Sequence, residues 1–151
     1  MIVSDNTSLI ILFDLKRTDL LSNLFMKIYI PSTVYKEISV KKEIALPSFM
    51  AVVEVEESND LTLLRKLLDD GESEAIVLAK EMKLGLIIDE KKGRKIAVNY
   101  GVEIIGLLGL IYLNIKKGHM TEDSAKLFLD EALAHGYRIN KKLILQMFKS
   151  L

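Results

Sequence analysis

The chain has 151 residues, half of them hydrophobic, and its 21 basic side chains equal its 21 acidic ones. This length and composition are typical of one folded domain and exclude a disordered chain, while the balanced charge leaves no global basic excess for binding nucleic acid. The absence of cysteine excludes disulfides, thiolate metal sites and cysteine nucleophiles.

The hydrophobicity pattern predicts strands that alternate with helices along the chain. Short apolar runs indicate buried strands, and apolar residues at helical spacing indicate helices. In chain order we expect a strand at 2–4, helices at 9–15 and 18–25, a strand at 27–30, a helix at 33–38, a strand at 52–56, helices at 61–68 and 72–82, a strand at 86–88, a helix at 91–98, a strand at 102–105, and helices at 110–115, 122–134 and 141–148. This alternation predicts an α/β fold in which helices cover both faces of a parallel sheet.

We expect a single domain over residues 1–151, because no repeat or low-complexity segment divides the chain. A basic linker around Lys41 and Lys42 ends at Pro47. The longest apolar segment, 104–115, is shorter than the roughly 20 residues that a membrane helix needs. The first residues also lack the pattern of a signal peptide. We therefore expect a cytoplasmic protein without a membrane segment.

Acidic residues lie at the ends of elements that a parallel sheet brings toward one edge. Asp5 follows the first strand, Asp89 follows a later strand, Glu72 begins a helix, and Glu37 lies in another helix. Ligands bind at the carboxyl ends of parallel strands, so we expect these acids to converge there. Converging carboxylates repel each other unless a cation lies between them. Their oxygens suit Mg²⁺ or Mn²⁺, and the pattern predicts a metal site for phosphodiester hydrolysis.

Each acid also has a simpler structural explanation. The helix dipole favours acids in the first turn of a helix, which accounts for Glu72 and Glu74, and Asp5 suits an ordinary helix cap. Glu72 shares the buried helix face of Ile76, whereas Glu74 points elsewhere. We therefore predict Glu72 as the ligand and keep Glu74 and Glu90 as second choices.

Polar and basic residues beside the acids are candidates for substrate binding. Asn6 and Thr7 could hold a phosphate oxygen or a metal-bound water, and capping the first helix is the alternative role. The cations Lys91, Lys92 and Arg94 follow Asp89 closely, which suits phosphate contacts. A solvated helix face is the more frequent explanation of such a charge run. Arg94 could also pair with one of the acids.

Four segments resemble, in order, the acid-bearing segments of PIN domains. They are residues 2–9, 30–37, 68–79 and 88–94. The segments G-E-S-E-A-I and D-E-K-K-G-R are similar to those of a prokaryotic branch that includes toxin ribonucleases of the VapC type. The resemblance covers residues 1 to about 115, and the order and spacing of four segments make it more specific than any single motif.

The resemblance implies a three-layer α/β/α fold with a small central parallel sheet. It implies a metal-dependent endoribonuclease that cleaves single-stranded RNA with Mg²⁺ or Mn²⁺, often the toxin of a toxin–antitoxin pair with a protein antitoxin, and usually a homodimer. Residue by residue, Asp5, Glu37, Glu72 and Asp89 match the four acids of the family. The third acid is usually Asp in the wider family, so Glu at this position is a departure.

Residues 116–151 contain the C-terminal helices, which the resemblance does not cover, and they are candidates for a dimer or partner interface. The alternative function is a catalytically weak or inactive binding module on the same fold. In that case the acids would cap helices, and the apolar helices would form an interface. Loss of metal-dependent RNA cleavage on substitution of Asp5 or Asp89 by Asn distinguishes the nuclease from the binding module.

Overall fold

The computed structural model describes residues 1–40 and 43–151, and its centre is a five-stranded sheet. The strands are β1 (Ile2–Ser4), β2 (Ile28–Pro31), β3 (Met50–Val53), β4 (Gly85–Ile87) and β5 (Ile104–Ile105). They lie in the order β3-β2-β1-β4-β5, and every neighbouring pair is parallel. The predicted basic linker at Lys41 and Lys42 lies outside the described residues.

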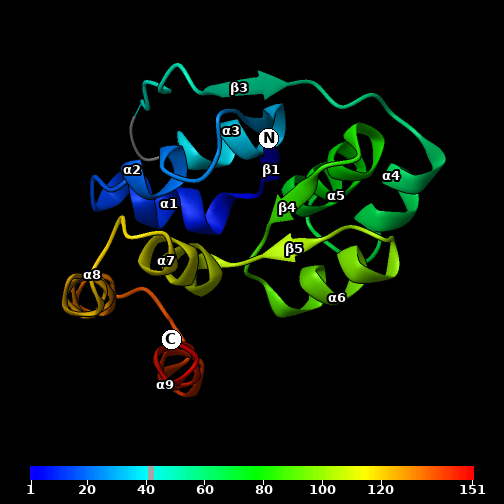
Figure 1. The fold of residues 1–151 in the computed structure, drawn as a ribbon. Coiled ribbons are helices and arrows are strands. Elements are labelled where there is room, and N and C mark those ends of the chain that lie inside the picture. The colour runs from blue at the N-terminus through cyan, green and yellow to red at the C-terminus, as the bar shows by residue number, and fades with distance from the viewer. Residues whose placement is uncertain (41–42) are drawn as a thin grey trace.

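Helices cover both faces of this sheet (Figure 1). They are α1 (Asn6–Asp14), α2 (Asp19–Ser22), α3 (Ser32–Ile38), α4 (Asn59–Arg65), α5 (Asp70–Met82), α6 (Lys91–Asn99), α7 (Leu107–Lys116), α8 (Glu122–Ala134) and α9 (Lys141–Lys149). Successive strand residues face opposite sides: Ile2 packs with α1, α2 and α7, whereas Val3 packs with α4, α5 and α6. The predicted three-layer α/β/α arrangement around a small parallel sheet is confirmed.

The strand order creates a switch point between β1 and β4. After β1 the chain adds β2 and β3 on one side, and then β4 and β5 on the other. At such a point the connections leave on opposite faces and a crevice opens beyond the carboxyl ends of the strands. Asp5 follows β1 directly, and its N–H donates to Ile87 O of β4 over 2.9 Å. Asp5 therefore lies at the switch point.

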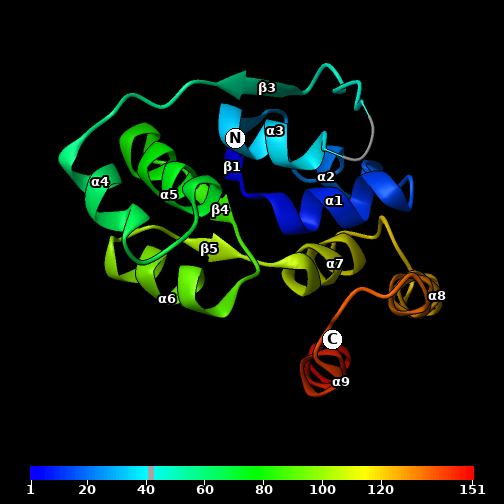
Figure 2. The same cartoon turned by 180° about the vertical axis from the view of Figure 1, so that it is seen from behind.

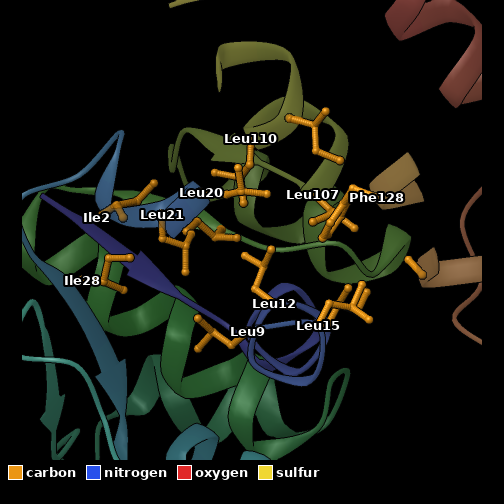
Figure 3. Packing of buried hydrophobic residues seen from close by; sticks show 14 of the residues in the cluster. Ile2, Leu9, Leu12, Leu15, Leu20, Leu21, Ile28, Leu107, Leu110 and Phe128 are labelled. Carbon is orange, nitrogen blue, oxygen red and sulfur yellow. The ribbon is translucent and has the colours of Figure 1, made fainter. Parts of the chain in front are cut away.

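One apolar cluster anchors α1 to its neighbours, as Figure 3 shows. Leu9 and Leu12 of α1 are fully buried, and they meet Leu20 of α2 and Leu107 of α7 in this cluster. Phe128 brings α8 into the same cluster. A helix that is apolar almost all round is thus covered on several sides, as its sequence indicates.

The first helix begins earlier than predicted, because the chain turns directly after Asp5. The N–H of Asp5 still bonds to β4, and the helix starts at the next residue. Asn6 and Thr7 therefore lie in the first turn, so the alternative role of capping this helix was wrong for both. Asp5 takes the N-cap position, but its side chain makes no capping hydrogen bond.

The two edge strands also differ from their predicted spans. β3 pairs with β2 only as far as Val53, which lies opposite Pro31 where β2 ends, so residues 54–56 do not extend the strand. β5 has two residues because Val102 N bonds to Ala97 O and closes α6 instead. Hydrogen-bond partners, which the local hydrophobic pattern does not reveal, set both limits.

The C-terminal helices lie beside α7 in both views (Figures 1 and 2). Thr121 and Asn140 cap them as their sequence indicates, since each side chain accepts a first-turn N–H. The apolar residues of these helices are only partly buried, because Leu127 is 70% exposed and Leu143 is 50% exposed. No helix in the described residues is long and apolar enough to cross a membrane.

Candidate functional site

Asp5 lies at the centre of a group of acidic residues at the switch point. Its side chain is buried, and its Oδ1 has no hydrogen-bond partner among the described residues. Burial is the main cause that raises the pKa of Asp5 to about 7, and the charges of Asp69, Glu37 and Asp89 raise it further. The backbone N–H of Asn6 acts in the opposite direction and lowers this pKa. A negative charge at Asp5 is therefore poorly compensated by the protein itself.

Glu72, in the first turn of α5, faces the same group. It is 8% exposed, and its Oε2 also has no hydrogen-bond partner among the described residues. Burial first, and then the carboxyl groups of Asp69, Asp5 and Glu90, hold the pKa of Glu72 well above its usual range. Asp5 and Glu72 thus favour protonation or a bound cation over two free negative charges.

Glu74 lies only two residues from Glu72 but has different partners. Its Oε2 accepts a hydrogen bond of 2.5 Å from Thr33 Oγ1 of α3 and lies 3.8 Å from Arg65 Nη2 of α4. A carboxylate that binds a hydroxyl and a guanidinium has its charge compensated within the protein. Of the two acids that the sequence left as alternatives, Glu72 is the one whose pKa the charge of Asp5 raises.

Glu37 approaches from α3 and is oriented by a neighbouring side chain. Its Oε2 accepts a hydrogen bond of 2.8 Å from Asn6 Nδ2, whereas its Oε1 is buried without a partner among the described residues. Burial is the first cause, and the charge of Asp69 the second, that raise the pKa of Glu37. Asn6 therefore orients the carboxyl group of Glu37. Thr7 is exposed, and its Oγ1 donates a hydrogen bond of 3.3 Å to Asn6 Oδ1.

Asp89 is bound on both of its carboxylate oxygens. Its Oδ2 accepts a hydrogen bond from Ser8 Oγ of α1, and its Oδ1 accepts one of 2.8 Å from Leu107 N at the start of α7. Asp89 therefore fixes α1 and α7 to the end of β4. Each carboxylate oxygen retains a further lone pair, so these bonds leave capacity to bind an additional ligand.

Two glycines provide the space that the buried carboxylates occupy. A Cβ at Gly71 would overlap Glu37 Oε1, and a Cβ at Gly93 would overlap Glu72 Oε2. Any larger residue would therefore displace an acid of the site. These close approaches give a physical reason for glycine in the G-E-S-E-A-I and D-E-K-K-G-R segments.

Asp69 and Ser8 belong to the site, although the sequence did not single them out for it. Asp69 caps α5, since its Oδ1 accepts a hydrogen bond of 2.8 Å from Glu72 N, and its charge raises the pKa of Asp5. The available signal was an acid at the predicted helix start, three residues before Glu72. For Ser8 no local signal exists, because its partner Asp89 is 81 residues away in the chain.

The basic residues lie at the rim of this site. Lys91 and Lys92 are exposed in the first turn of α6. Arg94 is partly buried, and its Nη1 donates a hydrogen bond of 2.7 Å to Ile88 O. This contact is with the backbone, whereas the sequence had suggested a pairing of Arg94 with one of the acids. Glu90 accepts a hydrogen bond of 2.7 Å from Gly93 N and caps α6, and this bond is the first cause that lowers its pKa.

The oxygens of the site suit a hard divalent cation, although they do not form a preassembled coordination shell. Within residues 1–40 and 43–151, no three acidic side chains form a group that could hold one metal ion. Buried oxygens of Asp5, Glu37 and Glu72 nevertheless have no partner in this part of the chain. Unpaired buried carboxylates are costly, and an all-oxygen donor set is what Mg²⁺ and Mn²⁺ prefer.

Comparison with known proteins gives a match over the whole chain. The family model described as "DUF3368: PIN domain" matches residues 1–151. This range includes the C-terminal helices, which the four sequence segments did not cover. A search of curated proteins finds no match.

Proposed function

Because the chain belongs to the PIN-domain family, we propose that it is a Mg²⁺- or Mn²⁺-dependent endoribonuclease that cleaves single-stranded RNA. PIN domains are in general nucleases that use divalent metal ions. The observation that carries the proposal for this chain is the pair of buried acids, Asp5 and Glu72, with raised pKa values and unpartnered oxygens at the switch point. Such a pair is stabilised when a cation compensates its charge.

In this proposal Asp5 and Asp89 are the primary ligands of the ion, and Glu37 and Glu72 complete the shell or orient water. The bound ion would activate the attacking water and neutralise charge that develops on the phosphate. Asn6 binds Oε2 of Glu37, and Oε1, which has no partner among the described residues, stays available for the ion or water. In this proposal the other side chains of the site only position the ligands and the substrate.

Substrate phosphates are proposed to contact Lys91, Lys92 and Arg94 at the rim. Lys91 and Lys92 are exposed, and all three cations lie in the first turn of α6, which follows Asp89 closely in the chain. Cationic contacts to phosphates position a nucleic acid without reading its sequence. Since the chain has no net charge, this local group has to provide the electrostatic attraction.

We further propose that the protein is the toxin of a cytoplasmic toxin–antitoxin pair, with a protein antitoxin as partner and a homodimer as the active form. The support is the resemblance of its G-E-S-E-A-I and D-E-K-K-G-R segments to toxins of the VapC type. Co-expression with the product of the adjacent gene, followed by measurement of growth, tests this part of the proposal separately.

The nuclease activity is tested by incubating the purified protein with a mixed RNA pool in Mg²⁺, in Mn²⁺ and in EDTA. Products that depend on the metal and disappear in Asp5→Asn are expected. The absence of a preassembled group of three acids in the described part of the chain favours a second candidate, a catalytically inactive binding module. That candidate predicts no metal-dependent products, and RNA binding that Asp5→Asn leaves unchanged.

A further inference from the structure

A groove of about 800 Å³ extends from Asp89 to the start of α9. Its walls come from the beginning of α6, from β5, from the first turn of α7 and from the first turn of α9. α9 and α7 are in contact, and Figures 1 and 2 both show α9 beside α7. The groove is thus continuous with the candidate active site, because Asp89 belongs to both.

The lining of this groove combines two kinds of side chain. The cations Lys91 and Arg94 line it together with Asp89. Aliphatic side chains of β5, α7 and α9, among them Leu108 and Leu143, form much of the remaining lining. Leu143 is 50% exposed, so an apolar side chain of this lining faces solvent.

We infer that this groove binds the substrate strand next to the cleaved phosphate, with the cations on its backbone and the aliphatic wall against a base. A single strand presents an anionic backbone and apolar base faces at the same time, and proteins bind it through cationic grooves with apolar platforms. In a duplex the base faces are stacked inside, and the aliphatic wall would have no ligand. The inference rests on the proposed nuclease function and makes Leu143 a substrate-binding residue.

This assignment gives the C-terminal helix a place in the substrate site. Asn140, which caps α9, also lines the groove. Asn140 and Leu143 in the first turn of α9 would therefore both contact the substrate. None of the described residues that line the groove is aromatic. Aliphatic contact with a base is weaker than the aromatic stacking that many single-strand binders use, so we expect a modest contribution from each leucine.

The chain offers a matched pair of variants for the test, Leu143→Ser and Leu145→Ser. Both leucines lie on α9 and are similarly exposed, at 50% and 60%. Leu145 lines a separate groove between α8 and α9. Replacing either exposed leucine by serine should therefore change the stability of the fold by a similar amount. Thermal unfolding of both variants checks this.

The measurements are steady-state cleavage of an unstructured RNA oligonucleotide and its binding to the protein in EDTA. Leu143→Ser should raise KM about fivefold and leave kcat unchanged, because the contact is made equally in ground and transition states. Its affinity for the oligonucleotide should fall by about the same factor. Leu145→Ser should match the wild type in both assays.

The outcomes separate this inference from the proposed function. If the wild type cleaves RNA but Leu143→Ser and Leu145→Ser behave alike, the groove assignment is wrong and the nuclease proposal stands. If the wild type cleaves nothing, the nuclease proposal fails, and weaker RNA binding by Leu143→Ser alone would still support the groove. Equal effects of Leu143→Ser on single-stranded and duplex RNA, or an effect only on self-association, would contradict a base-binding wall.

Discussion

Replacing Asp5 by Asn should stabilise the metal-free protein at neutral pH. Burial raises the pKa of Asp5 from 3.8 to about 7, so the folded state holds a proton that the unfolded state releases at lower pH. The corresponding stability is fully present below about pH 4 and is lost as pH rises to about 7. A difference of about three pH units at about 1.36 kcal/mol each corresponds to about 4 kcal/mol. Asn cannot ionise and does not suffer this loss.

Urea denaturation in EDTA at a series of pH values measures this effect. We expect the free energies of unfolding of the wild type and Asp5→Asn to be similar near pH 4, and Asp5→Asn to exceed the wild type by up to about 4 kcal/mol near pH 7. Asp60→Asn, which alters an exposed carboxylate of α4, is the matched control and should follow the wild type. Addition of Mn²⁺ at pH 7 should stabilise the wild type and leave Asp5→Asn unchanged.

A constant difference between the wild type and Asp5→Asn across this pH range would refute the reasoning. It would show that the carboxyl group ionises equally easily in the folded and unfolded states. Destabilisation by Asp5→Asn near pH 7 in EDTA would be equally contradictory, because it would mean that the negative charge stabilises the metal-free fold.

Four further substitutions test the rest of the site. Glu72→Gln should abolish metal-dependent cleavage. Glu74→Gln should mainly lower stability by about 1–3 kcal/mol, because the Glu74 carboxylate binds side chains of α3 and α4. Cleavage assays and urea denaturation of both variants distinguish the two effects. Gly93→Ala should reduce cleavage and cost about 1–3 kcal/mol, since its Cβ overlaps Glu72 Oε2. Ser8→Ala removes a hydroxyl donor from Asp89, and we expect lower kcat, unchanged KM and a stability loss of about 1–3 kcal/mol.

Each of these predictions has a result that would contradict it. Gly85→Ala is the matched control for Gly93→Ala, because a Cβ at Gly85 meets its nearest neighbour at an ordinary 3.5 Å; equal effects of the two would remove the steric argument. Loss of activity in Glu74→Gln with full activity in Glu72→Gln would exchange the roles of the two acids. A rise in KM alone in Ser8→Ala would place the hydroxyl at the substrate instead of at Asp89.

The layered fold could be predicted from sequence because its signals are local. The strand 2–4 was predicted with its observed bounds, and α5 and β4 lie within a few residues of the helix and strand expected from apolar spacing. Their order along the chain then determined the class, since alternating elements form parallel sheets. The edges were less predictable, because β3 ends where its partner β2 ends at Pro31.

The site could be predicted only as far as its chemistry follows from position along the chain. Acids after strands and at helix starts indicated Asp5 and Glu72, and helical periodicity indicated that Glu72 and Glu74 face different ways. The hydrogen bonds of Ser8 to Asp89 and of Asn6 to Glu37 join residues from distant segments. Such contacts depend on the tertiary fold and leave no periodic signal.

The central claim is that the buried acids at the switch point serve a metal-dependent nuclease. The most direct test is the rate of cleavage of single-stranded RNA by the purified protein as Mn²⁺ is titrated, with Asp5→Asn measured in parallel. A rate that rises with Mn²⁺ to saturation in the wild type and is absent in Asp5→Asn is the predicted result. Cleavage that is independent of metal, or equal in Asp5→Asn, would contradict the account.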